Sequence, residues 1–269
     1  MSGTPHLVAL DIDGTILTYE GVLTEPVRDA IRQVQTAGHH IVIATGRSIN
    51  GVTDLILDLG LSRGYAVCSN GAVTISIEPG HPDGYRIVDM VTFCPAAVIG
   101  VLQEHLPEAL YATEVVGRGI RTNRIWPDRE LHGEVEIVPI EQMKQSETTR
   151  VVVRSPDHTG PQFSEIVHRI GLHGVSYAVG HTAWLDLAPE GVSKASALEQ
   201  VRRRLHLQPQ HTVAVGDGRN DLEMVRWAAR GVAMDNSVDE LKEVAVEVAG
   251  NVDDDGLAGV LAPLFQPGG

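Results

Sequence analysis

The chain has 269 residues, with 21 Lys and Arg against 35 Asp and Glu, so its formal net charge is −14. This length predicts one or two domains. The acidic balance argues against a nucleic-acid binder or a binder of anionic membranes, since both need a basic face. An anionic substrate is not excluded, because one bound metal ion can reverse the charge of a local site.

The cysteines and the lack of targeting segments predict the cellular compartment of the protein. Cys68 and Cys94 form no CxxC pair and no disulfide framework, so we expect reduced thiols. The N-terminal segment lacks the basic region of a signal peptide, and no run of ~18 apolar residues occurs. We therefore expect a cytoplasmic protein that does not act at a membrane.

The first third alternates strand and helix. We expect a strand over 7–12, a helix over 24–37 and a strand over 40–45. This order predicts a parallel sheet with helices on its faces. In such sheets ligands bind beyond the carboxyl ends of the strands. The polar residues at these predicted ends are Asp11, Asp13 and Thr45.

The middle third has a different pattern. It predicts strands over 72–77, 85–93 and 148–154 and within 174–187, and helices over 95–105 and 162–170. Asn70-Gly71 predicts a hairpin turn. We interpret residues 82–188 as an inserted α+β cap domain in a discontinuous α/β core of residues 1–81 and 189–269.

Aromatic and basic residues of the middle third favour structural roles. Trp126 and Trp184 are expected to pack rather than to bind a ligand. Arg118, Arg121 and Arg124 form a small basic patch that could meet an anionic substrate, but a solvated loop is the favoured interpretation.

The last third repeats the alternation of the first. It predicts helices over 193–205, 220–229, 237–248 and 257–265, and strands over 212–215 and 231–234. Acids, an amide and two glycines follow the first of these strands as Gly216-Asp217-Gly218-Arg219-Asn220-Asp221. This density of acids indicates a nearby cation, although an Asx-rich helix cap is an alternative.

Three other clusters could carry chemistry. Asp11-Ile12-Asp13-Gly14-Thr15 has two carboxylates that could converge on Mg²⁺, and a carboxylate held in this way is a competent nucleophile. Thr45-Gly46-Arg47 could hold phosphate oxygens. Lys194, at a helix start, opposes the helix dipole, so it either has a compensating anion or points into solvent, and solvent is favoured for this lysine taken alone. The alternatives are an acidic turn, a helix cap and a solvent-exposed lysine.

In chain order, these four clusters resemble the four motifs of the haloacid dehalogenase (HAD) superfamily. Further segments resemble its Cof-type branch, subclass IIB: Ser69-Asn70-Gly71-Ala72, Gly191-Val192-Ser193-Lys194, Val232-Ala233-Met234-Asp235-Asn236-Ser237, and Asn251 with Asp254-Asp255-Gly256. The resemblance covers almost the whole chain. The pairing of DxDGT with GDGxND at this separation is specific.

The resemblance implies a Rossmann-like core, a mobile α/β cap of type C2B and Mg²⁺-dependent phosphoryl transfer. It implies that Asp11 is the nucleophile and that Asp13 protonates the leaving oxygen and then activates water. The implied phosphate-binding or substrate-binding residues are Thr45, Gly46, Arg47, Lys194 and Asn220. The implied metal ligands are Asp11, the backbone carbonyl of Asp13, Asp217 and Asp221.

From the resemblance we expect a phosphatase of small phosphomonoesters, such as sugar phosphates or related metabolites, that works through an aspartyl-phosphate. A phosphotransferase or phosphomutase of hexose phosphates is an alternative. A non-catalytic metabolite-binding or phospho-acceptor module is the third possibility. The expected partner is a small phosphorylated metabolite, with no nucleic acid and no membrane, and the expected state is a monomer or homodimer.

Overall fold

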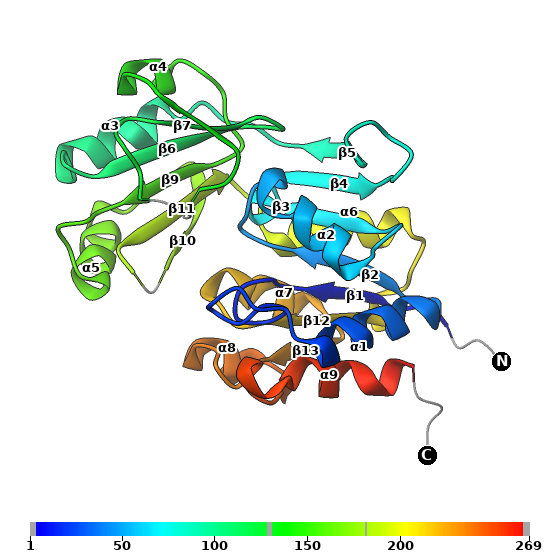
Figure 1. The fold of residues 1–269 in the computed structure, drawn as a ribbon. Coiled ribbons are helices and arrows are strands. Elements are labelled where there is room, and N and C mark those ends of the chain that lie inside the picture. The colour runs from blue at the N-terminus through cyan, green and yellow to red at the C-terminus, as the bar shows by residue number, and fades with distance from the viewer. Residues whose placement is uncertain (1–3, 128–130, 181, 266–269) are drawn as a thin grey trace.

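The structure is a computed structural model that describes residues 4–127, 131–180 and 182–265. Within these ranges the chain forms two sheets (Figure 1). An eight-stranded sheet has the order β14-β13-β12-β1-β2-β3-β4-β5, and a six-stranded sheet has the order β10-β11-β9-β6-β7-β8. The second sheet comes from one stretch of chain inserted between two parts of the first. The predicted α/β fold with an inserted α+β unit is confirmed.

The first sheet is parallel from β14 to β3 and ends in the antiparallel strands β4 and β5. Its strands are β1 (Leu7–Leu10), β2 (His40–Ala44), β3 (Tyr65–Cys68), β4 (Val73–Ile77), β5 (Tyr85–Met90), β12 (Thr212–Gly216), β13 (Arg230–Ala233) and β14 (Glu247–Val248). All four residues of β1 are buried, as expected for a central strand covered on both faces.

Helices cover both faces of this sheet. Side chains of β1 and β2 alternate between one apolar cluster with α1, α2 and α9 and another with α6 and α7. The helices are α1 (Glu25–Thr36), α2 (Thr53–Leu59), α6 (Lys194–Arg204), α7 (Leu222–Trp227), α8 (Asp239–Val244) and α9 (Gly256–Leu261). None of the helices in the described ranges is long and apolar enough to cross a membrane.

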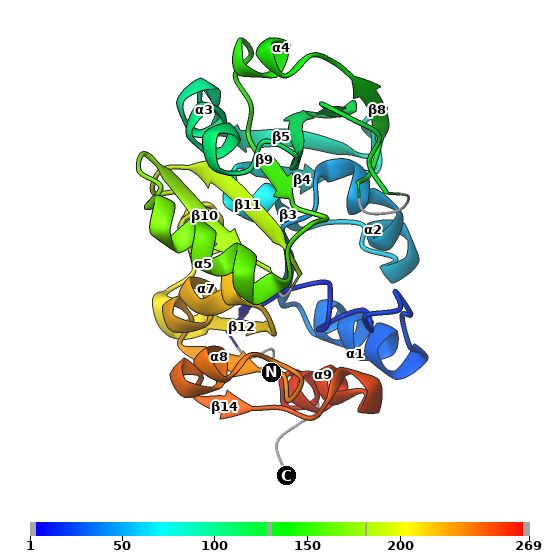
Figure 2. The ribbon, with the colours of Figure 1, turned by 90° about the vertical axis from the view of Figure 1, so that its left-hand side faces the viewer.

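The second sheet is mainly antiparallel and has helices on one face. Its strands are β6 (Leu110–Val115), β7 (Gly119–Thr122), β8 (Glu134–Ile137), β9 (Val151–Arg154), β10 (Val175–Val179) and β11 (Trp184–Pro189). Its helices are α3 (Ala96–His105), α4 (Ile140–Lys144) and α5 (Gly160–Ile170). Figure 2 shows this unit stacked on the first.

The structure corrects two boundaries of the sequence interpretation. Strand β5 pairs with β4, so the first sheet extends past the predicted domain boundary at residue 82. Strand β11 continues to Pro189, one residue past the predicted end of the insert. A hairpin has no change of composition that marks which sheet its second strand joins. Below, "insert" means residues 91–189 and "core" means the rest.

The predicted helix over 237–248 is also wrong at its end. Helix α8 stops at Val244, and Glu247–Val248 forms the edge strand β14 beside β13. The sequence does not signal this short strand, because two residues show no periodicity.

Candidate active site

Three strands place the predicted residues at one edge of the core sheet. β1, β12 and β2 are parallel neighbours, so their carboxyl ends meet. Asp11 directly follows β1, Thr45 follows β2 and Asp217 follows β12. The backbone N–H of Asp11 continues the ladder by donating to the Val215 carbonyl at 3.0 Å. The topology therefore gathers residues that are far apart in sequence.

The centre of the site is a buried acidic cluster. Carboxylate oxygens of Asp11, Asp217 and Asp221 lie within 4.8 Å of one another. Lys194 lies among them, and its Nζ donates to Asp11 Oδ1 and to Asp221 Oδ1, both at 2.6 Å. The Lys194 side chain is 0% exposed, so the alternative of a solvent-exposed lysine is wrong.

Local sequence explains this arrangement around Lys194 and Asp221. Ser193 is the N-cap of α6 and accepts from the Ser196 N–H, which fixes the helix start that carries Lys194. Asp221 Oδ2 accepts the backbone N–H groups of Asp217 and Gly218 at 3.1 and 2.9 Å. The Asp221 carboxylate therefore holds the backbone at the start of this motif in place.

Gly14 lets two motifs approach closely. Its φ is +79°, and a Cβ there would lie 2.3 Å from Asp217 Oδ2. Asn236 donates to the Gly14 carbonyl at 2.8 Å, and Tyr19 donates its hydroxyl to Asp217 Oδ2. Sequence reasoning missed a role for Tyr19, because an isolated tyrosine in a loop carries no motif.

Burial and mutual repulsion dominate the electrostatics of the cluster. Burial, reinforced by Asp221, raises the pKa of Asp11 well above its usual value, against the effect of Lys194. Burial also raises the pKa of Asp217 to about 6, although the Tyr19 hydrogen bond opposes this. Burial alone would lower the pKa of Lys194, but Asp11 and Asp221 outweigh it and raise that pKa.

The donor set fits a divalent cation. Three buried carboxylates face a single lysine, so two negative charges stay uncompensated if all are ionised. Isolated buried charge is costly, and Mg²⁺ prefers oxygen ligands of this kind. Asp11, Asp217 and Asp221 could hold such an ion. The Asp13 carboxylate lies outside this group, and the contribution of its backbone carbonyl stays a prediction.

Asp13 faces Arg47 instead. Arg47 Nε donates to Asp13 Oδ2 at 2.9 Å and Nη2 contacts Oδ1, while Nη1 donates to the Gly51 carbonyl at 3.2 Å. The Asp13 side chain is 53% exposed, in contrast to the acids beneath it. Buried Thr45 accepts the Arg47 backbone N–H at 3.1 Å through Oγ1. Asp13 is thus accessible to a molecule in the cavity above.

A cavity of about 330 Å³ opens over the cluster. The core lines it with Asp11, Asp13, Thr45, Gly46, Arg47, Asp217 and Asn220, and the insert lines it with His132, Arg150, Trp184 and Asp186. All the predicted catalytic and phosphate-binding residues except Lys194 line this cavity. Lys194 lines the adjoining cavity described below, and its Nζ contacts Asp11 Oδ1. The structure brings the predicted site together.

The four lining residues of the insert were missed by sequence reasoning. Arg150 Nε donates to Asp186 Oδ1 at 2.5 Å, and Trp184 Nε1 donates to Asp186 Oδ2 at 2.9 Å. Trp184 also packs edge to face on Trp126, so the expected packing role is present beside a cavity role. No motif spacing joins residues 150 and 186. Arg150 directly precedes β9, and the pairing of β9 with β11, on which Asp186 lies, brings the two residues together.

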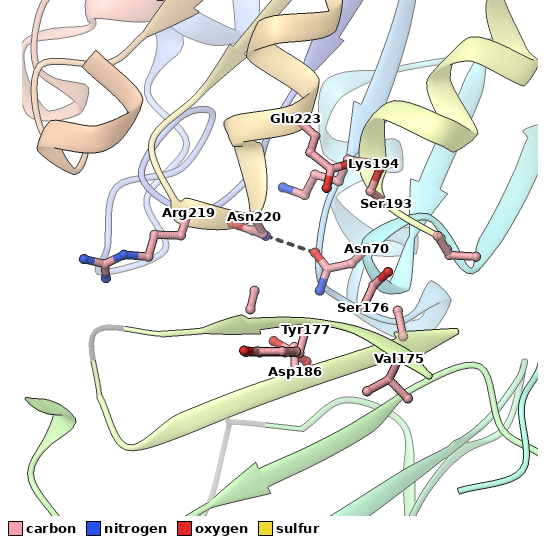
Figure 3. A pocket seen from close by; sticks show the side chains of 13 residues that line it. Asn70, Val175, Ser176, Tyr177, Asp186, Ser193, Lys194, Arg219, Asn220 and Glu223 are labelled. Carbon is pink, nitrogen blue, oxygen red and sulfur yellow. Dashed lines mark hydrogen bonds between the residues drawn. The ribbon is translucent and has the colours of Figure 1, made fainter. Parts of the chain in front are cut away.

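A second cavity of about 250 Å³ adjoins the first (Figure 3). The two share Asn220 and Asp186 as lining residues. Asn220 Nδ2 donates to Asn70 Oδ1 at 3.0 Å, and Figure 3 shows this bond above the strands β10 and β11. The basic patch of the insert does not reach either cavity, and its three arginines pair with Glu134, Glu136 and Glu108.

The fold and the site define a parallel α/β protein with a buried, oxygen-rich centre beneath an inserted sheet. The chain belongs to the haloacid dehalogenase-like hydrolases, whose family model matches residues 8–261. This confirms the Cof-type HAD resemblance of its motifs.

Known relatives agree with this family. A Streptococcus pyogenes protein named "Putative phosphatase M6_Spy0533" is 29% identical over 94% of this chain and 95% of its own length. The 5-amino-6-(5-phospho-D-ribitylamino)uracil phosphatase YcsE of Bacillus subtilis is 25% identical over 94% and 92%. The solved structure of BT1666 from Bacteroides thetaiotaomicron, described among HAD phosphatases, matches with a TM-score of 0.76 and 26% identity, covering 97% of this chain and 95% of that one. The chain is an enzyme of the phosphatase type.

Proposed function

We propose that the protein is a Mg²⁺-dependent phosphatase that hydrolyses small phosphomonoesters, sugar phosphates or related metabolites, through an aspartyl-phosphate. The observation that carries the proposal is the placement of Asp11. Its carboxylate lies at the floor of the cavity, held by Lys194 at 2.6 Å and grouped with Asp217 and Asp221. A carboxylate fixed in this way can attack phosphorus.

In the proposed reaction, two displacements occur in turn at phosphorus. An Asp11 oxygen forms a bond to phosphorus while the bond to the leaving oxygen breaks, and Asp13 gives that oxygen a proton. Asp13, now a carboxylate, then takes a proton from water as the water oxygen bonds to phosphorus and the Asp11–phosphorus bond breaks. Asp13 suits both steps because it faces the cavity rather than the buried cluster.

The remaining residues bind and orient the phosphoryl group. Lys194 Nζ contacts Asp11, and the same cavity that Asp11 lines is also lined by Thr45, Gly46, Arg47 and Asn220. A bound Mg²⁺ would neutralise charge on the phosphoryl oxygens. Asp11, Asp217 and Asp221 would hold it, with the Asp13 carbonyl as a further ligand.

The insert acts in this proposal as the cap that receives the leaving group. Its cavity lining carries no net charge, because Arg150 and Asp186 neutralise each other. Burial, with Arg47 nearby, lowers the pKa of His132, so its imidazole is neutral at pH 7. Such a lining offers hydrogen bonds to uncharged hydroxyl groups. The relative YcsE acts, by its name, on a phosphorylated ribityl chain, which supports the same substrate class.

The test is phosphate release, with and without Mg²⁺, from hexose phosphates, phosphoglycolate, pyridoxal phosphate and flavin mononucleotide. Mg²⁺-dependent release that is absent in Asp11→Asn supports the proposal. Isomerisation of a hexose phosphate without release would indicate a phosphomutase instead. A cytoplasmic location and a monomeric or homodimeric state are further parts of the proposal, checked by fractionation and by light scattering.

A further inference from the structure

The loop Ser69–Gly71, a 3₁₀ turn between β3 and β4, has an unfavourable backbone. Ser69 and Asn70 have φ values of 50° and 52°, in the left-handed region of the backbone that residues other than glycine rarely adopt. Gly71 follows with φ at 106°. Two successive non-glycine residues in this region, Ser69 and Asn70, persist only where the surroundings hold them, and such sites cluster at functional positions.

This loop contacts three segments of the active site. Ser69 N–H donates to the Arg47 carbonyl at 2.8 Å, and Asn70 N–H donates to the Thr45 carbonyl at 3.0 Å. The Asn70 side chain accepts from Asn220 (Figure 3). A Cβ on Gly71 would lie 2.2 Å from the Ser193 carbonyl, directly before Lys194. The loop backbone therefore sets the positions of groups that line or support the cavity.

The same loop holds a buried carboxylate of the insert. Ser69 Oγ donates to Glu114 Oε2 at 2.5 Å, and Thr149 Oγ1 donates to the same oxygen at 2.8 Å. Glu114, on β6, is 7% exposed, so its carboxyl group needs these donors for hydrogen bonds that water cannot supply. The Thr149 bond lies within the insert, whereas the Ser69 bond crosses from core to insert. Glu114 keeps both donors only while the insert is seated on the loop.

We propose that Ser69 and Glu114 are positioning residues that couple seating of the insert to the geometry of the active site. The hydrogen bond between them stabilises the strained loop when the insert is in place. The loop in turn holds Thr45, Arg47 and Asn220 for reaction. Loss of this bond lowers the fraction of correctly arranged enzyme, so kcat falls while KM changes little. The inference rests on the proposed function, since its measure is phosphate release.

The structure offers a matched pair of variants for the test. Ser69→Ala and Thr149→Val each remove one hydroxyl donor from the same Glu114 oxygen, but only the first removes a bond between core and insert. We expect Ser69→Ala to lower kcat for a generic aryl phosphate about tenfold with KM within about twofold, and Thr149→Val to keep kcat within about twofold. Ser69→Gly also lacks the hydroxyl but suits the positive φ, so we expect a loss of kcat in the same direction but smaller; this variant covers the case in which Ser69→Ala does not fold.

A double variant and thermal unfolding complete the design. Ser69→Ala with Glu114→Gln is expected to lower kcat no further than the more affected single variant, because both act through one bond. Equal kcat losses in Ser69→Ala and Thr149→Val, or lowered unfolding temperatures with kcat unchanged, would show a purely structural bond and overturn the inference. Wild-type protein that released no phosphate would overturn the proposed function, and the inference with it.

Discussion

Core and insert both contribute polar side chains to one cavity, but they do so in different ways. Each core residue of the cavity belongs to a short motif at a strand end or helix start, such as Asp11 and Asp13 or Asp217 and Asn220. The insert residues come from separate strands and loops and hold one another, as Arg150 and Asp186 do. In the proposed function, the core therefore encodes the chemistry in local sequence, whereas the insert encodes the choice of substrate in tertiary pairing.

The largest expected effect tests the core side of this comparison. Asp11→Asn removes the proposed nucleophile but keeps the shape of the side chain. We expect phosphate release to fall by at least about 10³-fold for every substrate, with a folded protein by circular dichroism. The control is Asp253→Asn, an exposed acid outside the cavity, which should be fully active. Substantial turnover in Asp11→Asn would contradict a covalent role for this carboxylate.

Removal of the divalent cation should have the next largest effect. A chelator is expected to lower phosphate release about 10³-fold, and added Mg²⁺ should restore it. The same ion should stabilise the fold by about 2.7 kcal/mol at a concentration 100 times its dissociation constant.

The pH dependence of this stabilisation follows from Asp217. Its pKa of about 6 in the folded protein exceeds the unfolded value of 3.8. Protonation of Asp217 therefore stabilises the metal-free fold below pH 4, and this stabilisation is lost as pH rises through 6. Because the ion competes with that proton, Mg²⁺ should raise the thermal unfolding temperature more at pH 7.5 than at pH 5. An equal rise at both values would contradict the role of Asp217 as a ligand.

Lys194→Met should have a smaller effect on turnover and a larger one on stability. The variant keeps an apolar chain of similar length but leaves the Asp11 and Asp221 carboxylates without their shared cation. We expect turnover to fall about 10²-fold and the free energy of unfolding to drop by about 3–5 kcal/mol, measured by urea denaturation. Mg²⁺ should recover part of the stability. Lys242→Met is the comparison variant, because Lys242 on α8 is partly exposed and pairs with the exposed Asp235. A similar loss of stability in that variant would show that the effect of Lys194→Met is not specific to the buried cluster.

The same contrast explains how much could be predicted from the sequence. The core fold and its acidic centre were predictable, because strand ends, turn glycines and paired acids are local signals. For Lys194 the sequence alone favoured a solvent-exposed side chain. The hydrogen bonds of Lys194 to Asp11 and Asp221 in the structure show that it is buried instead. The insert side of the cavity was not predictable. Arg150 lies in a segment with a strand pattern, and Trp184 was expected to pack in the interior. Nothing in either segment indicates that both side chains donate hydrogen bonds to Asp186.

The smallest expected effect tests the insert side of the comparison. Asp186→Asn keeps the size of the side chain but weakens its bonds to Arg150 and Trp184 and removes a charged acceptor from both cavities. We expect kcat/KM for the preferred sugar phosphate to fall about tenfold, while a generic aryl phosphate, which has no hydroxyl groups to bind, keeps its value within about twofold. Asp157→Asn, an exposed acid at a turn of the insert, serves as the control. Equal losses of kcat/KM on both substrates would show that Asp186 supports the chemical step itself. The separation between a catalytic core and a substrate-selecting insert would then fail, because this residue of the insert would serve catalysis as well as selection.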